Sequence, residues 1–141
     1  MNSDLLKAKK MLHEGGYTCV LCKSDKVYTS NERGVKPLLN WLDSNINLND
    51  FCAADKVIGK AAAFLYVLAN VCEVYAGVIS EPAKAVFEKY NIHVYYKTCV
   101  TAIRNRSNTG FCPMETAVKD IDNPIVAKEK ITETLRVLKN S

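Results

Sequence analysis

The chain has 141 residues, 48% of them hydrophobic and 24% charged, which suits a single globular domain over residues 1–141. Its formal net charge of +4 comes from scattered lysines rather than a basic stripe, so nucleic acid is an unfavoured partner. No apolar run approaches the ~20 residues that span a bilayer, and residues 1–16 lack the apolar core of a signal peptide. We therefore expect a cytoplasmic protein without a membrane partner.

Two helices and a hairpin are predicted in the first third of the chain. Residues 3–13 carry an amphipathic pattern that begins at Ser3, a candidate cap, and ends at two glycines. Residues 17–23 and 26–30 are rich in β-forming residues and are separated by a turn, which is typical of a hairpin. Residues 31–45 then predict a helix with a proline in its first turn.

Six cysteines raise the question of a metal site, and their spacing argues against one. Cys19 and Cys22 form a single C-x-x-C pair on a predicted strand, where residues three apart point to opposite faces. The other cysteines are far apart in the sequence, and scattered cysteines are usually small buried hydrophobic residues. We therefore predict no metal and no cofactor.

The stretch from Ala53 to Asn70 is predicted to be the central helix. Residues 61–69 carry no charge, so this helix would be buried on most sides. In that helix Lys56 and Lys60 are four residues apart and share a face, where their like charges repel. A pair of lysines at the mouth of a core helix predicts an anionic partner.

A strand, a helix and a second strand are predicted next. Residues 72–80 are apolar at most positions, as in a strand that is covered on both faces. Residues 81–90 predict a helix, and residues 92–96 predict the next strand. This order is a βαβ unit, so we expect the two strands to be parallel.

The last third of the chain predicts a polar loop and two more helices. Residues 97–110 end in the loop sequence RNRSNTG, and residues 111–120 predict a short helix. Asn123 and Pro124 would start the last helix. The whole order predicts a three-layer α/β/α sandwich with a mixed sheet of four or five strands.

Three residues of the central stretch are candidates for a site. Asp55 can act as a general base or can orient a ligand, although an Asp near a helix start is most often a cap. Gly59 costs stability inside a helix, so it either permits close packing or admits a ligand. Lys60 either binds an anion or extends out of the core to solvent.

Two further groups of candidates lie outside the central stretch. Arg33 and Lys36 flank a glycine at a helix start, where they either bind an anion with the free N–H groups or form a basic solvent face. Cys112 precedes a helix-starting proline, and Glu115 follows it at a capping distance. A thiol at such a position can have a lowered pKa, although neither histidine is an evident partner base.

Four sequence segments resemble those of a known family. In chain order they are RGVKPLL, ADKVIGKAAA, VYAGVIS and NRSNTGFCPME. It is a family of small bacterial proteins classed as a domain of unknown function, number 1893, and the resemblance runs from Tyr17 to Asp122. It implies a cytidine-deaminase-like fold and no assigned activity. Because the resemblance includes the Asn-Arg pair, it also adds Asn105 and Arg106 as ligand-binding candidates.

Deaminases of that fold hold zinc through a His or Cys followed by Ala-Glu, and through a later Pro-Cys-x-x-Cys. By topology, the resemblance places the first motif at residues 54–56 on the central helix and the second at residues 80–83. The residues there are Ala-Asp-Lys and Ser-Glu-Pro-Ala, which supply none of the zinc ligands of these motifs. Lys56 stands near the place of the proton-shuttling Glu, so the resemblance makes it a catalytic candidate beside Asp55 and Cys112. A catalytic zinc needs three protein ligands, so deaminase chemistry is not expected.

The leading hypothesis is therefore a deaminase-like domain without zinc that binds a small anionic ligand, such as a nucleotide. Lys56, Lys60 and Arg106 would neutralise the anion, Asp55 would orient a polar group, and catalysis is left open. A second hypothesis is a non-catalytic regulatory module that uses the same pocket. A zinc deaminase with unrecognised ligands is the third, and a homodimer is expected only by analogy with other deaminase-like proteins.

Overall fold

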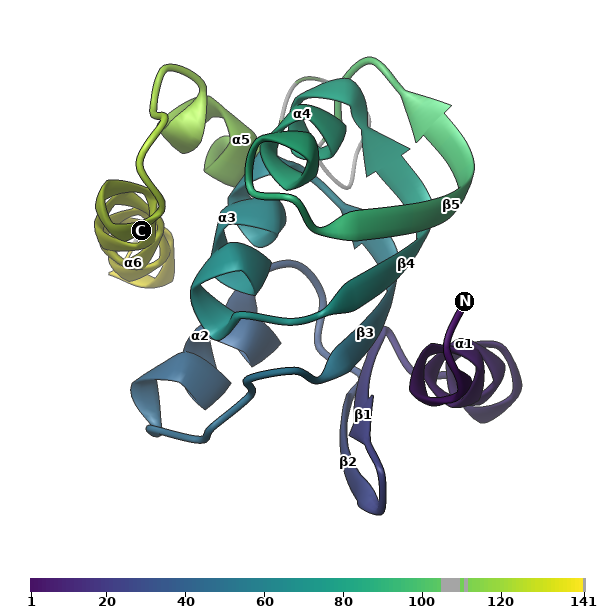
Figure 1. Ribbon diagram of the computed structural model, residues 1–141. Helices are drawn as coiled ribbons and strands as arrows, with labels where there is room; N and C mark the ends of the chain where they lie inside the picture. Colours follow the sequence, from purple (N-terminus) through teal and green to yellow (C-terminus); the bar gives the residue numbers. More distant parts are fainter. Residues whose placement is uncertain (105–109, 111, 141) are drawn as a thin grey trace.

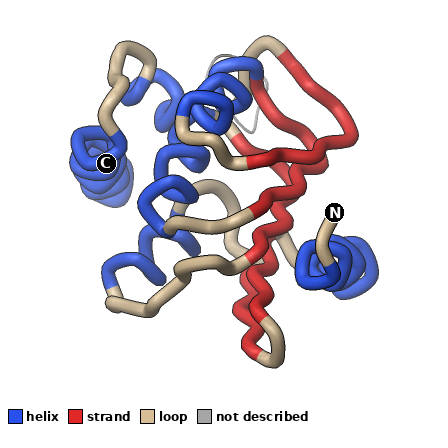
Figure 2. Tube along the Cα trace, in the orientation of Figure 1, coloured by secondary structure: helices blue, strands red, loops and turns tan. Residues whose placement is uncertain are grey.

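A mixed five-stranded sheet forms the centre of the computed structural model, which describes residues 1–104, 110 and 112–140. In chain order the strands are β1 (Cys19–Lys23), β2 (Lys26–Ser30), β3 (Cys52–Ile58), β4 (Glu73–Ser80) and β5 (His93–Val100). In space they follow the order β2-β1-β3-β4-β5 (Figure 2). β1 is antiparallel to both β2 and β3, whereas β3, β4 and β5 are parallel. The predicted hairpin and the predicted parallel pair are both confirmed.

Helices cover both faces of this sheet and form the outer layers (Figure 1). The helix α1 (Ser3–Gly15) lies alone on one face within the described part of the chain. The other face carries α2 (Lys36–Asp43), α3 (Lys60–Ala69), α4 (Glu81–Lys89), α5 (Pro113–Val118) and α6 (Pro124–Asn140). The helix α3 packs against α4 and α6, and α5 packs against α6. The predicted α/β class with a mixed sheet is thus confirmed.

Each face of the sheet has its own hydrophobic core. On the α1 side, Leu5, Ala8 and Leu12 lie one helical turn apart and pack on the sheet, which is the face expected from a 3.6-residue period. Cys22 belongs to this core, whereas Cys19 belongs to the core on the other face. The prediction that these two cysteines point to opposite faces is therefore confirmed.

The predicted central helix over residues 53–70 is wrong in its first part. Residues 52–58 form β3, Gly59 is the extended N-cap residue of α3, and the helix begins at Lys60. Two alanines favour a helix by intrinsic propensity, but β3 lies between β1 and β4 with its first four residues buried, and this tertiary context decides the outcome. The dipeptide Val57-Ile58 followed by glycine was the local signal for a strand that ends there.

Several helix ends follow from local capping chemistry. The N-cap of α1 is Asn2 rather than the predicted Ser3, and its side chain accepts the Leu5 N–H at 2.9 Å. Asn123 accepts two N–H groups at the start of α6, as its position before a proline predicted. Gly16 ends α1 with a φ of 70°, a left-handed conformation that favours glycine.

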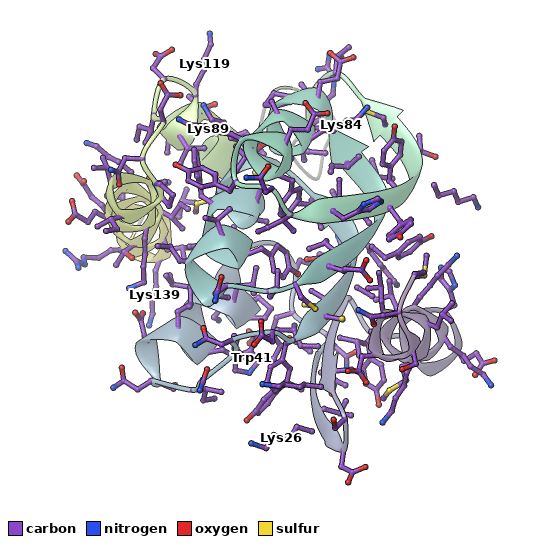
Figure 3. All side chains as sticks on the ribbon, in the orientation of Figure 1. Lys26, Trp41, Lys84, Lys89, Lys119 and Lys139 are labelled. Carbon is purple, nitrogen blue, oxygen red and sulfur yellow. The ribbon has the colours of Figure 1, made fainter. Side chains whose placement is uncertain are left out.

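Lysine side chains are distributed over several elements of the fold. The labelled lysines are spread over β2 (Lys26), α4 (Lys84 and Lys89), the end of α5 (Lys119) and α6 (Lys139) (Figure 3). None of the helices in the described part of the chain is long and apolar enough to cross a membrane.

Candidate functional site

A cavity of about 870 Å³ lies beside the carboxyl-terminal half of β3. Segments far apart in the sequence form its walls: Thr18 before β1, residues 33–36 at the start of α2, β3 itself, the start of α3, residues 103–104 after β5, α5 and α6. Most of its lining is apolar, and this volume is within the range of about 300–1,000 Å³ that small-molecule sites occupy. Its apolar lining residues include Val35, Val57, Ala62, Met114, Leu135 and Leu138.

Basic side chains from three separate segments line this cavity. Arg33 comes from the turn before α2, and Lys36 is the first residue of α2. Lys56 comes from β3, and Arg104 follows β5. All four residues are exposed, so their charges lie at the cavity mouth. Lys36 also forms a long surface ion pair with Glu32, at 3.8 Å between Nζ and Oε1, which offsets part of its charge. The mouth is therefore a place where a small anion would meet cations.

The carboxyl group of Asp55 lies deep in the same cavity and is only 8% exposed. Its Oδ2 accepts a hydrogen bond of 2.7 Å from the Tyr66 hydroxyl, and its Oδ1 accepts the Val57 N–H at 3.2 Å. The Tyr66 hydroxyl in turn lies 3.2 Å from the Cys19 thiol. The prediction that Asp55 caps a helix is wrong, because Asp55 lies within β3 and its carboxylate binds α3 through Tyr66.

Burial raises the pKa of Asp55 from 3.8 to about 7, and its hydrogen bonds oppose this rise only in part. The pKa values of Tyr66 and Cys19 are also raised, chiefly by burial, so both groups keep their protons at neutral pH. Asp55 is then the member of this network that exchanges a proton near pH 7. A carboxyl group of this kind is suited to general acid or base chemistry.

Tyr66→Phe tests this network directly. The substitution removes the donor that lowers the pKa of Asp55, so we expect that pKa to rise further and the protein to lose about 1–2 kcal/mol at pH 7.5. The loss should be smaller at pH 5, where Asp55 is protonated and the lost hydrogen bond is to a neutral acceptor. Urea unfolding at both pH values measures the effect. Tyr90→Phe is the control, since it removes an exposed hydroxyl that donates to the Asp122 carbonyl. Equal losses of stability at both pH values for Tyr66→Phe would contradict the assignment of Asp55 as the group that titrates near pH 7.

Glu115 and Gly59 form one structural unit at the start of α3. The Glu115 carboxylate accepts the Lys60 N–H at 2.6 Å and the Ala61 N–H at 3.0 Å. A Cβ atom on Gly59 would collide with that carboxylate, so glycine here permits a close approach. Glu115 was predicted to cap its own helix, but it lies in α5 and caps α3 instead. The positive end of α3 is therefore occupied by an internal carboxylate.

The predicted pairing of Lys56 and Lys60 on one helical face is wrong, since Lys56 lies in β3 and only Lys60 lies in α3. The Lys60 ammonium donates to the Lys119 carbonyl at 2.8 Å and lies 5.6 Å from the centre of the Phe64 ring. Lys60 lines a second cavity of about 280 Å³, where it meets Glu115 and residues of α5. It thus holds α5 against α3 and does not line the larger cavity.

Cys112 lines the larger cavity as the half-buried N-cap residue of α5. His13 packs edge-on against Tyr75, and His93 stacks with Tyr95, so neither histidine lies on the wall near Cys112. The other predicted ligand-binding residues, Asn105 and Arg106, lie outside the described residues. Within the described part of the chain, Cys112 is therefore a wall residue without a histidine beside it.

The residues expected at the zinc motifs supply neither the His nor the Cys ligands of a deaminase. Residues 54–56 lie on a strand, where Asp55 is the one possible ligand, and the following helix starts with Gly59-Lys60-Ala61, which lacks His, Cys, Asp and Glu. The second predicted position is the Ser80 N-cap and first turn of α4. Among residues 1–104, 110 and 112–140, no three His, Cys, Asp or Glu side chains gather closely enough to hold a metal ion.

Two residues of the site were not identified from the sequence. Tyr66 lies in an apolar helix, where a tyrosine is easily taken for a core residue. Its hydroxyl group could have indicated a role in the site, because a buried hydroxyl needs a hydrogen-bond partner. Thr18 lines the cavity and its carbonyl accepts the Lys56 N–H at 3.0 Å. This contact depends on the pairing of β1 with β3, which the sequence analysis did not anticipate.

These features define an α/β protein with a mixed sheet and a cavity that holds a buried carboxyl group. Residues 7–135 match the family described as "Domain of unknown function (DUF1893)", and the chain belongs to this family. The crystal structure of a DUF1893 family protein, TM1506 from Thermotoga maritima, is similar to it with a TM-score of 0.84 and 25% sequence identity. The similarity covers 96% of this chain and 91% of that chain. No curated protein matches the sequence.

Proposed function

We propose that this protein binds a small anionic ligand, of the size and charge of a nucleotide, in the cavity beside β3. The observation that carries this proposal is the buried Asp55 carboxyl group in a cavity whose mouth holds Arg33, Lys36 and Lys56. An apolar wall with a few convergent polar groups is the usual composition of a small-molecule site. The cations would neutralise the anionic part of the ligand, and Asp55 would contact a polar group at the opposite end.

If the ligand is chemically changed, Asp55 is the residue we assign to proton transfer. A pKa of about 7 leaves the carboxyl group free both to accept and to donate a proton at neutral pH. The neighbouring Tyr66 hydroxyl fixes the orientation of the carboxyl group. The Cys112 thiol lies on the wall of the same cavity and is the second candidate for a role in such a reaction.

We also infer a cytidine-deaminase-like fold. The resemblance of the four sequence segments supports this fold. The parallel strands β3 and β4 also support it, because each leads directly into a helix at the position of a deaminase motif. Zinc-dependent deamination is the least favoured alternative, because neither helix start offers the His or Cys ligands of the deaminase motifs. The single-domain organisation, the cytoplasmic location, the lack of a cofactor and the homodimer remain predictions.

A non-catalytic binding module is the second candidate function. The internal carboxylate of Glu115 favours it, because the end of α3, which would otherwise stabilise an anion during a reaction, is already occupied. A binding module needs only the cations and the shape of the cavity.

A thermal-shift series with nucleotides and phosphorylated metabolites tests ligand binding. A ligand at one hundred times its dissociation constant should stabilise the protein by about 2.7 kcal/mol. Arg33→Gln and Lys56→Gln should each reduce this shift, whereas Lys26→Gln, on β2 and away from the cavity, should not. Equal shifts for all three variants would place the anion elsewhere and contradict the proposal.

Incubation of the bound ligand followed by mass spectrometry separates an enzyme from a binding module. If the wild-type protein converts the ligand, we expect Asp55→Asn to bind the ligand without converting it. This variant should therefore still give a thermal shift. A ligand that the wild-type protein binds and leaves unchanged for hours would favour the regulatory module.

A further inference from the structure

Two cysteine side chains meet at the amino ends of the parallel strands β3 and β4. Cys52 is the first residue of β3, and Cys72 directly precedes β4. Their sulfur atoms are 3.1 Å apart. The backbone holds them there, since the Cys72 N–H donates to the Phe51 carbonyl at 2.9 Å and Cys52 pairs with Glu73 in the strand register. Neighbouring strands are about 4.8 Å apart, a spacing compatible with the Cα separations that disulfides bridge.

The two thiols differ in exposure. Cys72 is exposed, whereas Cys52 is 1% exposed and donates its S–H to Asn2 Oδ1 at 3.2 Å. Burial raises the pKa of Cys52 to about 12, so this thiol keeps its proton in the reduced protein. The Cys72 thiol donates to the Asp50 carbonyl at 3.3 Å and is the sulfur that a dissolved oxidant meets first.

We propose that Cys52 and Cys72 form a reversible disulfide when the protein meets a low-molecular-weight disulfide such as oxidised glutathione. The Cys72 thiolate attacks one sulfur of that disulfide, the external S–S bond breaks, and one thiolate leaves. Cys52 gives its proton to the departing thiolate, and its sulfur attacks Cys72 Sγ. The second external thiol is then released. Two protein thiols are oxidised, and one external disulfide is reduced to two thiols.

The disulfide would fasten two adjacent strands across a chain segment that contains all of α3. Cys52 and Cys72 are 20 residues apart in the sequence, so the bond closes a loop in the unfolded chain and lowers its entropy. It would leave the start of α1 intact, because Asn2 Oδ1 still accepts the Leu5 N–H. Oxidation should therefore stabilise the folded protein without rearranging it.

The test equilibrates the reduced full-length chain in glutathione buffers of increasing oxidised fraction, followed by peptide mapping without reductant. We expect a Cys52–Cys72 disulfide and a higher melting temperature than that of the reduced protein. Cys72→Ser should abolish both effects. Cys99→Ser removes another exposed cysteine and should leave both effects unchanged.

Two results would overturn the proposal, and both are measured on the wild-type chain. One is a lasting glutathione adduct on Cys72 without the internal bond. The other is a fraction of Cys52–Cys72 disulfide no larger in the folded protein than in the same chain unfolded in urea, because the proposed proximity would then have no effect.

Discussion

Asp55→Asn is expected to flatten the pH dependence of the free energy of unfolding between about pH 4 and pH 7. In the wild type, the pKa of Asp55 is raised in the folded state, from 3.8 to about 7. The folded protein therefore binds more protons than the unfolded chain in this range, so stability falls as the pH rises through it and levels off above about pH 7. Asn is uncharged and removes this contribution.

The size of the effect follows from the pKa shift. A shift from 3.8 to about 7 corresponds to about 4 kcal/mol, and we expect about 2–3 kcal/mol because Asp55 borders an open cavity. The two other groups of the hydrogen-bond network do not imitate this signal, because burial raises the pKa values of Tyr66 and Cys19 and both titrate above this range. The amide of Asn can still accept the Tyr66 hydroxyl or the Val57 N–H, so the fold should persist.

Urea unfolding at half-unit steps from pH 4 to pH 8 measures this difference. Asp25→Asn removes an exposed carboxyl group in the hairpin turn and is the matched control, which should keep the wild-type profile. Identical profiles for the wild type and Asp55→Asn would mean that Asp55 is already ionised at pH 4. The acid–base role proposed for it would then fail.

Glu115→Ala is expected to destabilise the protein by about 2–3 kcal/mol. The substitution leaves two N–H groups of α3 without their partner and removes a carboxylate from the positive end of that helix. Glu129→Ala, at an exposed position of α6, controls for the loss of a helical glutamate and should change stability little. Denaturant unfolding of the three proteins gives the comparison.

A double-mutant cycle with Gly59→Ala makes this prediction more specific. The new methyl group would displace the Glu115 carboxylate, so Gly59→Ala alone should cost nearly as much as Glu115→Ala. In the Glu115→Ala background the same methyl group has room, and its cost should largely disappear. Additive losses would show that Gly59 and Glu115 act independently.

The parts of the fold with strong local signals could be predicted from the sequence. The hairpin, the helix starts at Pro37, Pro82 and Pro124, and the parallel pair β4 and β5 all follow from turn chemistry and periodicity. β3 was misassigned because Ala53-Ala54 favours a helix and nothing local reveals the two strands beside it. That error also placed Lys56 and Lys60 on one face.

The candidate site could be predicted by residue type but not by arrangement. Asp55, Lys56, Arg33 and Lys36 do line one cavity, although Asp55 and Lys56 come from a strand rather than from a helix start. The role of Glu115 depends on a contact across 55 residues of sequence, which no local pattern encodes. Tyr66 was missed for the same reason, since its partner is known only once β3 is placed.

The cavity also has a consequence for the order in which the protein matures. Its inner wall, with Asp55, is synthesised in the first half of the chain, whereas Met114, Glu115 and Leu135 are synthesised near the end. The ribosome synthesises a chain from its amino terminus at about 5–20 residues per second. A nascent chain that ends before α5 would have all the strands of the sheet but would lack the cavity walls that α5 and α6 supply. The cavity is therefore completed only when the last two helices have been synthesised.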